Sequence, residues 1–234
     1  MRLAFEDVSY SYEGGEAKKR RGRRKKDAAR QADWGNAPDA VWALRDVTFT
    51  VEPGEFFGVA GHTGSGKSTL AKRLGERYGL PVLHMDTVHF LPGWVERPFA
   101  EEEAMVRQFL DENAGGWVID GNYSKTCYAR RLKEADKIIV LWFSPLVCLW
   151  RAVRRWQQNK GRVRESSAPG CEEKIDAEFV RWILHDGRTA KKRAEIERIG
   201  EEYPEKYVMI RNQRELDGFL EFIKSKDSRA GGAD

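Results

Sequence analysis

Cysteine is scarce in this chain of 234 residues: Cys127, Cys148 and Cys171 are odd in number and widely spaced. No C-x-x-C pair occurs, which argues against both a disulfide framework and a zinc site. Long apolar runs are also lacking, because the longest, from Ile138 to Phe143, is far too short to span a bilayer. The first residues lack the apolar core of a signal peptide. We therefore expect a protein of the reducing cytoplasm, with any membrane contact made through a partner.

The net charge of +4 is unevenly distributed. Every residue from Lys18 to Lys26 is basic except Gly22, so this run carries eight positive charges and the rest of the chain a net charge of −4. The folded part is thus mildly acidic and not a basic platform for nucleic acid. The run lies in a polar insert, residues 13–38, that has too few apolar side chains to order itself. It could bind nucleic acid or anionic lipid, but a solvated, disordered loop is the favoured interpretation.

Residues 61–68 match the G-x-x-x-x-G-K-[ST] pattern of a phosphate-binding loop. The apolar run 56–60 is the strand that must precede it, and 69–74 has the helical spacing that must follow, so a helix N-terminus adds partial positive charge. Lys67 can reach the β and γ oxygens, and Ser68 offers a hydroxyl to Mg²⁺. The alternative is an ordinary glycine-rich turn, but such a turn would not require both the preceding strand and the following helix. We therefore predict that the chain binds Mg·ATP on Gly61, His62, Thr63, Gly64, Ser65, Gly66, Lys67, Ser68 and Thr69.

Strands and helices alternate after this loop, as is typical of a parallel sheet covered on both faces. We predict strands at 81–84, 117–120, 137–143 and 207–210, and helices at 99–113, 123–134, 145–160 and 215–224, with one long charged helix before the last strand. Two β-rich segments, residues 3–10 and 43–51, predict antiparallel strands ahead of the loop strand. We expect a hairpin appendage over residues 1–52, a P-loop domain over 53–226 and a disordered tail over 227–234.

Two carboxylates, Asp86 and Asp120, each close a predicted strand on the edge that carries the phosphate loop. The carboxyl ends of parallel strands meet at one crevice, where ligands bind. One carboxylate could hold Mg²⁺ through water, for which Asp120 is our candidate together with Ser68, and the other could orient or deprotonate an acceptor hydroxyl. The alternative for either residue is an Asp that caps the next helix.

Arginines cluster on the helix predicted at 145–160 and on the loop after it. Arg151, Arg154 and Arg155 share one helix face, and Arg162 and Arg164 follow. Such a cluster can neutralise the charge of a transferring phosphoryl group if the loop closes as a lid. We take Arg151, Arg155, Arg162 and Arg164 as catalytic candidates with Lys67, Asp86 and Asp120; a solvated basic face is the alternative.

His84 and His89 flank Asp86, but no third ligand lies at a convincing spacing for a metal. Structural histidines are therefore the favoured interpretation. The tryptophans at 142, 150, 156 and 182 are more often core residues than a ligand platform.

The start of the chain, residues 1 to about 70, resembles the ATP-binding subunits of energy-coupling-factor ABC transporters. The similar segments are 5–12 (FEDVSYSY), 43–49 (ALRDVTF), 53–56 (PGEF) and 61–70 (GHTGSGKSTL). By this resemblance, Tyr12 would stack on adenine. The chain after residue 70 contains no L-S-G-G-Q signature, no apolar strand ending in Asp-Glu and no switch histidine in context. An ABC ATPase would need all three, so that family is the alternative assignment.

Residues from about 70 to 225 resemble instead the DNA topology modulation protein family, small P-loop proteins similar to adenylate kinase and shikimate kinase. The similar segments are 80–86 (LPVLHMD), 92–98 (PGWVERP), 117–123 (WVIDGNY), 135–136 (AD), 148–151 (CLWR), 161–164 (GRVR) and 179–182 (FVRW). One departure is Trp142-Phe143-Ser144-Pro145-Leu146, where an Asp-x-Pro-Arg type of segment is expected. The simplest account is a chimera joined within the shared phosphate loop.

A chimera would leave the apolar residues of the first 52 positions without the core of an ABC ATPase. We expect them to dock weakly on the sheet and to cause some self-association; they are Val8, Tyr10, Trp42, Leu44, Val47, Phe49 and Val51.

These observations predict an α/β fold, the three-layer P-loop NTPase sandwich with a parallel, nucleoside-kinase-like central sheet, plus an N-terminal antiparallel β-hairpin. The expected function is transfer or hydrolysis of the γ-phosphate of Mg·ATP, with an acceptor that the sequence does not reveal. The alternatives are an ABC transporter ATPase subunit and a nucleotide-gated DNA-binding regulator that acts through the basic run.

Overall fold

The computed structural model describes residues 8–11, 42–47 and 54–225, which fall into two compact units. Residues 54–212 belong to the larger unit. The smaller unit contains strands β1 (Val8–Ser11) and β2 (Trp42–Val47) and helix α8 (Gln213–Ser225). The predicted insert with its basic run, the predicted tail and Tyr12 lie outside the described residues.

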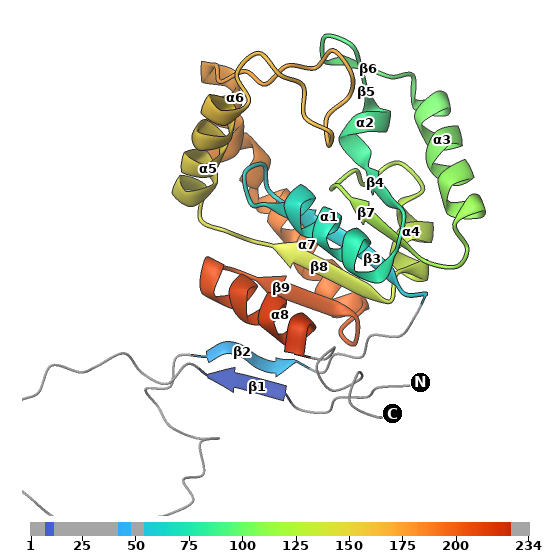
Figure 1. Cartoon of the computed structure of the whole chain (residues 1–234), viewed down its shortest axis with the longest axis vertical. Helices are drawn as coiled ribbons and strands as arrows, with labels where there is room; N and C mark the ends of the chain where they lie inside the picture. Colours follow the sequence, from blue (N-terminus) through green and yellow to red (C-terminus); the bar gives the residue numbers. More distant parts are fainter. Residues whose placement is uncertain (1–7, 12–41, 48–53, 226–234) are drawn as a thin grey trace, which may run out of the picture. The chain divides into compact units, whose positions relative to one another are not determined.

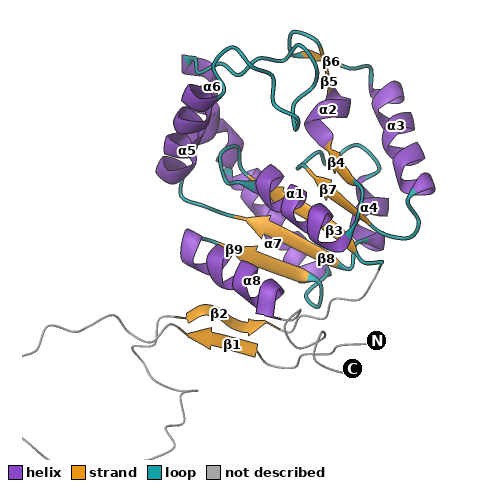
Figure 2. Cartoon of the chain, in the orientation of Figure 1, coloured by secondary structure: helices purple, strands orange, loops and turns teal. Residues whose placement is uncertain are grey.

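A five-stranded parallel sheet forms the centre of the larger unit (Figures 1 and 2). Its spatial order is β4 (Val82–His84), β7 (Trp117–Asp120), β3 (Phe56–Gly61), β8 (Lys137–Leu141) and β9 (Tyr207–Ile210). Every neighbouring pair is parallel. β7 is buried throughout, and β8 is buried after its first residue, which explains why both read as apolar runs. The predicted fold class, a parallel sheet flanked by helices, is confirmed.

Helices and one short hairpin connect these strands. In chain order they are α1 (Lys67–Tyr78), α2 (Met85–His89), β5 (Phe90–Leu91), β6 (Val95–Glu96), α3 (Phe99–Glu112), α4 (Tyr128–Glu134), α5 (Pro145–Gln158), α6 (Ala177–Leu184), the 3₁₀ turn η2 (Asp186–Arg188) and α7 (Ala190–Glu202). Ser144 caps α5 and Pro145 occupies its first position, which fixes where that helix begins.

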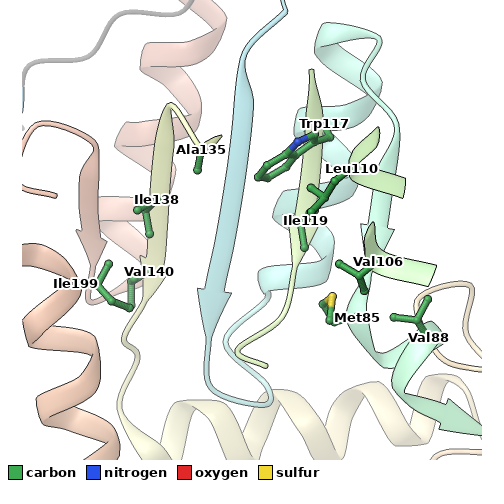
Figure 3. Packing of buried hydrophobic residues seen from close by; sticks show 10 residues of the cluster. All are labelled: Met85, Val88, Val106, Leu110, Trp117, Ile119, Ala135, Ile138, Val140 and Ile199. Atoms are coloured by element: carbon green, nitrogen blue, oxygen red, sulfur yellow. The ribbon is translucent and has the colours of Figure 1, made fainter. Parts of the chain in front are cut away.

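The core on one face of the sheet combines alternate strand residues with helix residues (Figure 3). This cluster consists of Met85, Val88, Val106, Leu110, Trp117, Ile119, Ala135, Ile138, Val140 and Ile199. Because side chains alternate along a strand, Val118 and Ile139 belong to the opposite face. On α1, which packs against β3 and β7, the buried residues Leu70 and Leu74 recur at helical spacing. Layers on both faces hold the carboxyl ends of β3, β4 and β7 in fixed positions.

Three elements differ from those predicted. The helix expected from Tyr123 begins at Tyr128, because residues 121–127 form a loop in which Gly121 has φ +148° and Cys127 φ +46°. The long charged helix is two helices, α6 and α7, and Thr189 caps the second by accepting from the Lys192 N–H. Helix α2 and the β5–β6 hairpin were not predicted.

The smaller unit contains the predicted antiparallel strand pair. β1 and β2 pair with the register Val8 to Val47, Tyr10 to Leu44 and Ser11 to Trp42. The closing helix, expected at 215–224, runs from Gln213 to Ser225 as α8, and Phe219 is among its buried residues.

Candidate functional site

The predicted phosphate loop, residues 61–69, joins β3 to α1 and has a constrained backbone. The Ser65 N–H donates to the His62 carbonyl at 3.0 Å. Gly64 has φ +84°, and a Cβ there would lie 2.2 Å from the carbonyl oxygen of Cys148 in α5. The Ser65 hydroxyl is buried and, among the described residues, has no hydrogen-bond partner. The loop thus places backbone N–H groups and an unused hydroxyl at a helix N-terminus, a position that favours an anion.

Asn122 fixes the start of this loop from the neighbouring strand. Its Oδ1 accepts from the Gly61 N–H at 2.8 Å, and its Nδ2 donates to the Gly61 carbonyl at 2.9 Å. Asn122 follows β7, which pairs directly with β3, so the parallel register brings the amide to the glycine. On the side of β7, where the pairing of β3 ends at Val59, this two-point contact takes the place of ladder hydrogen bonds.

Lys67 and Asp120 form a buried ion pair, with 3.2 Å between Nζ and Oδ1. The other carboxylate oxygen lies 3.0 Å from His84 Nδ1. Burial opposes the charge on Asp120, but Lys67 and hydrogen bonds from His84 and Ser68 outweigh it and lower the pKa of Asp120. Burial likewise opposes the charge on Lys67, and Asp120 with Asp86 more than offsets it and raises the pKa of Lys67. The pair is therefore an ammonium and a carboxylate at neutral pH.

The two residues predicted to hold Mg²⁺, Ser68 and Asp120, lie side by side. Ser68, at the start of α1, lies close enough to the Asp120 carboxylate to lower its pKa. Within the described ranges, no group of three or more His, Cys, Asp or Glu side chains is placed to hold a metal alone. A hydroxyl and a carboxylate next to a phosphate loop fit Mg²⁺, which takes its other ligands from water and phosphate oxygens.

Asp86, the second predicted carboxylate, lies at the start of α2, just beyond β4. The Tyr123 hydroxyl donates to its Oδ1 at 2.7 Å. Burial, followed by the charge of Asp86, raises the pKa of Tyr123, so the phenol stays protonated and remains a donor. Asp86 is thereby oriented through Oδ1, and within the described part of the chain no hydrogen bond or ion pair engages its Oδ2.

His89 belongs to a buried polar cluster next to Tyr123. Its Nδ1 lies 2.8 Å from Glu102 Oε2, and the Thr126 hydroxyl donates to Glu102 Oε1 at 2.6 Å. The His89 ring also packs against Tyr123, with 4.5 Å between the centroids. His84 thus contacts Asp120 directly, whereas His89 pairs with Glu102 and packs against Tyr123, the donor to Asp86.

The predicted arginines divide into two groups. Arg151 Nη1 donates to the Ser65 carbonyl in the phosphate loop at 2.9 Å. Arg155 and Arg164 both approach Glu173 Oε1 through their Nε atoms, at 2.7 and 2.5 Å. By contrast, Arg162 is exposed, so the structure does not place this predicted catalytic residue with the others.

Arg154, the third arginine on the predicted face of α5, is also exposed, and its guanidinium lies over the ring of Trp150. Trp150 itself is 60% exposed and Trp182 46% exposed, so neither is the core residue that was expected. Both instead lie beside cations, with Lys192 over the Trp182 ring at 3.9 Å.

The loop after α5 is fastened to several elements of the larger unit. Glu165 pairs with Lys72 of α1 at 2.5 Å. The Trp94 indole N–H, from the β5–β6 hairpin, donates to the Glu172 carbonyl at 2.9 Å, and the Cys171 thiol donates to the Leu91 carbonyl at 3.3 Å. These contacts fasten the loop, the segment expected to act as a lid, to α1 and to the β5–β6 hairpin (Figure 1).

Trp142 begins the segment that departs from the Asp-x-Pro-Arg type, and its ring makes a packing contact. The Trp142 ring lies 4.3 Å from the His62 ring, centroid to centroid. His62 is 8% exposed. Burial, and then the charges of Arg188 and Lys192, lower the pKa of His62 to about 4. The loop histidine is therefore neutral in the folded protein near pH 7.

This pKa predicts a pH-dependent stability. Because the pKa of His62 is about 4 when folded and 6.5 in its ordinary state, the unfolded chain binds the proton first as pH falls. The free energy of unfolding should therefore drop by about 2 kcal/mol from this residue between pH 7 and pH 5. Urea denaturation at both pH values should show this drop in the wild type and a smaller one in His62→Gln. Equal drops in the two proteins would contradict the assignment.

Three residues of the site were not predicted from sequence: Asn122, Tyr123 and Glu173. Asn122 and Tyr123 lie two and three residues after Asp120, and the end of a buried parallel strand could have indicated them. Glu173 had no local signal, because it is one of many acidic residues in a charged stretch.

Comparison with known proteins supports the nucleotide site. The ABC transporter family model matches residues 44–141, which include the phosphate loop. The energy-coupling factor transporter ATP-binding protein EcfA1 of Levilactobacillus brevis is 57% identical over 44 residues, 19% of this chain and 14% of that protein. EcfA2 of Caldanaerobacter subterraneus is 54% identical over 37 residues, 16% of this chain and 13% of that protein.

A longer match is to the ribose import ATP-binding protein RbsA 2 of Burkholderia pseudomallei, 31% identical over 144 residues, 60% of this chain and 24% of that protein. The aligned region thus spans a quarter or less of each of these relatives. A solved structure of an uncharacterized protein from Eubacterium ventriosum aligns with TM-score 0.38 and 13% identity over 75% of this chain and 99% of its own.

No helix in the described part of the chain is both long and apolar enough to cross a bilayer. With the loop geometry, the matches to ABC transporter ATP-binding proteins establish that the chain carries an ATP-binding P-loop NTPase domain.

Proposed function

We propose that this domain is a phosphotransferase that moves the γ-phosphate of Mg·ATP to a hydroxyl group of a small molecule. The observation that carries the proposal is the pair of carboxylates at the carboxyl edge of the sheet. Asp120 is committed to Lys67 and Ser68 beside the phosphate loop, whereas Asp86 is held by Tyr123 with one oxygen left over. Nucleotide binding alone does not require the second carboxylate; proton removal from an acceptor does.

Each part of the site has a role in this reaction. The loop N–H groups and Lys67 bind the β- and γ-phosphates. Mg²⁺, held by Ser68 and Asp120, would neutralise phosphate charge. Asp86 accepts the proton of the acceptor hydroxyl through Oδ2, while the hydroxyl oxygen bonds to the γ-phosphorus and the bond from that phosphorus to the β–γ bridging oxygen breaks. ADP is the leaving group, and its developing charge is stabilised by Lys67.

The arginines supply further positive charge for the transferring phosphoryl group. Arg151 is anchored to the Ser65 carbonyl of the loop, and Arg155 and Arg164 meet at Glu173 in the lid. Positive groups placed before the reaction stabilise the charge that spreads over the transferring phosphoryl group, without reorganising during the step. The residue pattern after position 70 that resembles the topology modulation family is consistent with such a kinase-like reaction.

The test is transfer of the γ-label of ATP to a panel of nucleosides, nucleoside monophosphates and small hydroxyl compounds. Asp86→Asn should lower transfer by about 100-fold, the usual contribution of a general base, and should leave ATP affinity within a factor of about three. Asp111→Asn removes an exposed carboxylate of α3 and should behave as wild type. Transfer at the wild-type rate by Asp86→Asn would refute the role of the base.

An ABC transporter ATPase subunit is the second candidate, favoured by the family match over residues 44–141. In that case the label would be released only as phosphate, and turnover would require a membrane partner and a second ATPase surface. The absence of an L-S-G-G-Q signature from the sequence favours the phosphotransferase. The DNA-binding alternative depends on the basic run, which lies outside the described residues; its affinity for DNA would collapse as salt increases.

A further inference from the structure

The acidic residue of the lid, Glu173, is buried between two arginines from different segments. Its side chain is 6% exposed, and its Oε1 lies 2.7 Å from Arg155 Nε and 2.5 Å from Arg164 Nε. Arg155 is in the last turn of α5, and Arg164 is in the loop that follows. One carboxylate oxygen therefore joins the helix, the loop and the segment before α6.

Glu173 is itself held in place from both sides. Residues 171 and 172 are fastened to the β5–β6 hairpin by the Cys171 thiol and the Glu172 carbonyl. Three residues after Glu173, Asp176 caps α6 by accepting from the Phe179 N–H at 2.8 Å. A short segment anchored at both ends keeps the carboxylate at a defined point.

Each of the two arginines is coupled by charge to a different residue of the site. Electrostatically, Arg155 acts on Lys67 in the phosphate loop, and Arg164 interacts with Asp86. Both guanidinium groups meet Glu173 through Nε. Among the described residues, the Arg155 side chain forms no other ion pair or hydrogen bond, and the Arg164 side chain forms one more through Nη1, to Ser166. Terminal nitrogens of both forks are therefore left for a ligand.

We propose that Glu173 is a positioning residue that holds Arg155 and Arg164 together so that their free nitrogens bind the γ-phosphate of ATP. Without the carboxylate, two partly buried guanidinium groups would repel each other and separate. With the carboxylate present, the two arginines and Glu173 together carry a net charge of +1. The arginines are then oriented before ATP arrives, which lowers the free-energy cost of ordering two long side chains on binding. The inference rests on the proposed function only in requiring that the loop bind ATP.

The inference predicts discrimination between nucleotides with and without a γ-phosphate. The experiment measures, in Mg²⁺, the affinities for ADP and for the β,γ-imido analogue of ATP, by calorimetry on the full chain. The ratio of the two dissociation constants should favour the analogue in the wild type and fall at least fivefold in Glu173→Gln. Glu173→Asp, which keeps the charge, should recover part of the ratio. Glu172→Gln, a change at an exposed neighbour, should leave it unchanged.

Each outcome has one meaning. An unchanged ratio in folded Glu173→Gln, or equal affinities for the two nucleotides in the wild type, overturns the positioning role and leaves ATP binding intact. If the wild type binds neither nucleotide, the proposed function fails at its first step. Thermal unfolding of each variant in parallel shows whether it is folded. If Glu173→Gln is unfolded, Glu173→Asp decides, because its shorter side chain cannot hold both guanidinium groups as Glu173 does: a ratio below that of the wild type supports the role, and an unchanged ratio overturns it.

Discussion

Replacing Lys67 by alanine should lower ATP affinity by about 100-fold and abolish turnover, because a buried charged donor to phosphate is lost. The Lys67 side chain is 15% exposed, and its ammonium is already fixed beside Asp120 before any ligand arrives. The substitution also leaves Asp120 buried without its counter-charge, so the free energy of unfolding should fall by about 3 kcal/mol. Calorimetric titration with ATP and urea denaturation measure the two effects.

A second variant separates these effects. In Lys67→Ala/Asp120→Asn the buried carboxylate is replaced by a neutral amide, so most of the lost stability should return while ATP affinity stays about 100-fold below that of the wild type. Arg73→Ala removes an exposed cation from the same helix and should match the wild type in both assays. If Lys67→Ala keeps wild-type affinity for ATP, the phosphate loop is not the nucleotide site.

Gly64→Ala should cost about 3 kcal/mol of stability and prevent ATP binding. Its new Cβ would lie 2.2 Å from the Cys148 carbonyl oxygen, a backbone atom that cannot move without shifting α5. Overpacking of this kind costs about 1–3 kcal/mol, and the left-handed φ of +84° adds about 1 kcal/mol. Because Gly64 lies in the phosphate loop, the chain can relieve the clash only by displacing the backbone N–H groups of the loop, which would bind the phosphates of ATP.

Gly79→Ala is the matched control for this change. Gly79 follows α1 with φ +64°, and no atom lies within 4 Å of a Cβ built there. Only the strain of the left-handed backbone remains, so the free energy of unfolding of the control should fall by about 1 kcal/mol, and its ATP affinity should equal that of the wild type. Equal losses in the two variants would show that contact with Cys148 does not fix the loop.

The sequence was sufficient to predict the residues that local rules control. The loop motif with its flanking strand and helix located Lys67 and Ser68, and the rule that parallel strands end at one edge placed Asp86 and Asp120 at the same edge of the sheet. Strand β8 was recognised because a buried parallel strand is apolar throughout. These features depend on spacing within a few residues.

Contacts that depend on register and side-chain direction could not be predicted. Arg154 and Arg155 are adjacent on a helix, and both fit the predicted basic face, yet Arg154 lies over Trp150 and Arg155 pairs with Glu173. The Asn122 contact joins residues 61 positions apart, which only the pairing of β3 with β7 determines. Residues 121–127 have the composition of a helix start, but Tyr123 is committed to Asp86 and the helix begins later.

The most direct test of the account is the fate of γ-labelled ATP incubated with the wild type, Mg²⁺ and the acceptor panel, beside Lys67→Ala purified in the same way. The account predicts that label moves from ATP to one class of hydroxyl acceptor, that chelation of Mg²⁺ stops the transfer, and that Lys67→Ala transfers none. A folded wild-type protein that leaves all the label on ATP, or that releases it only as phosphate with every acceptor, would contradict the phosphotransferase assignment.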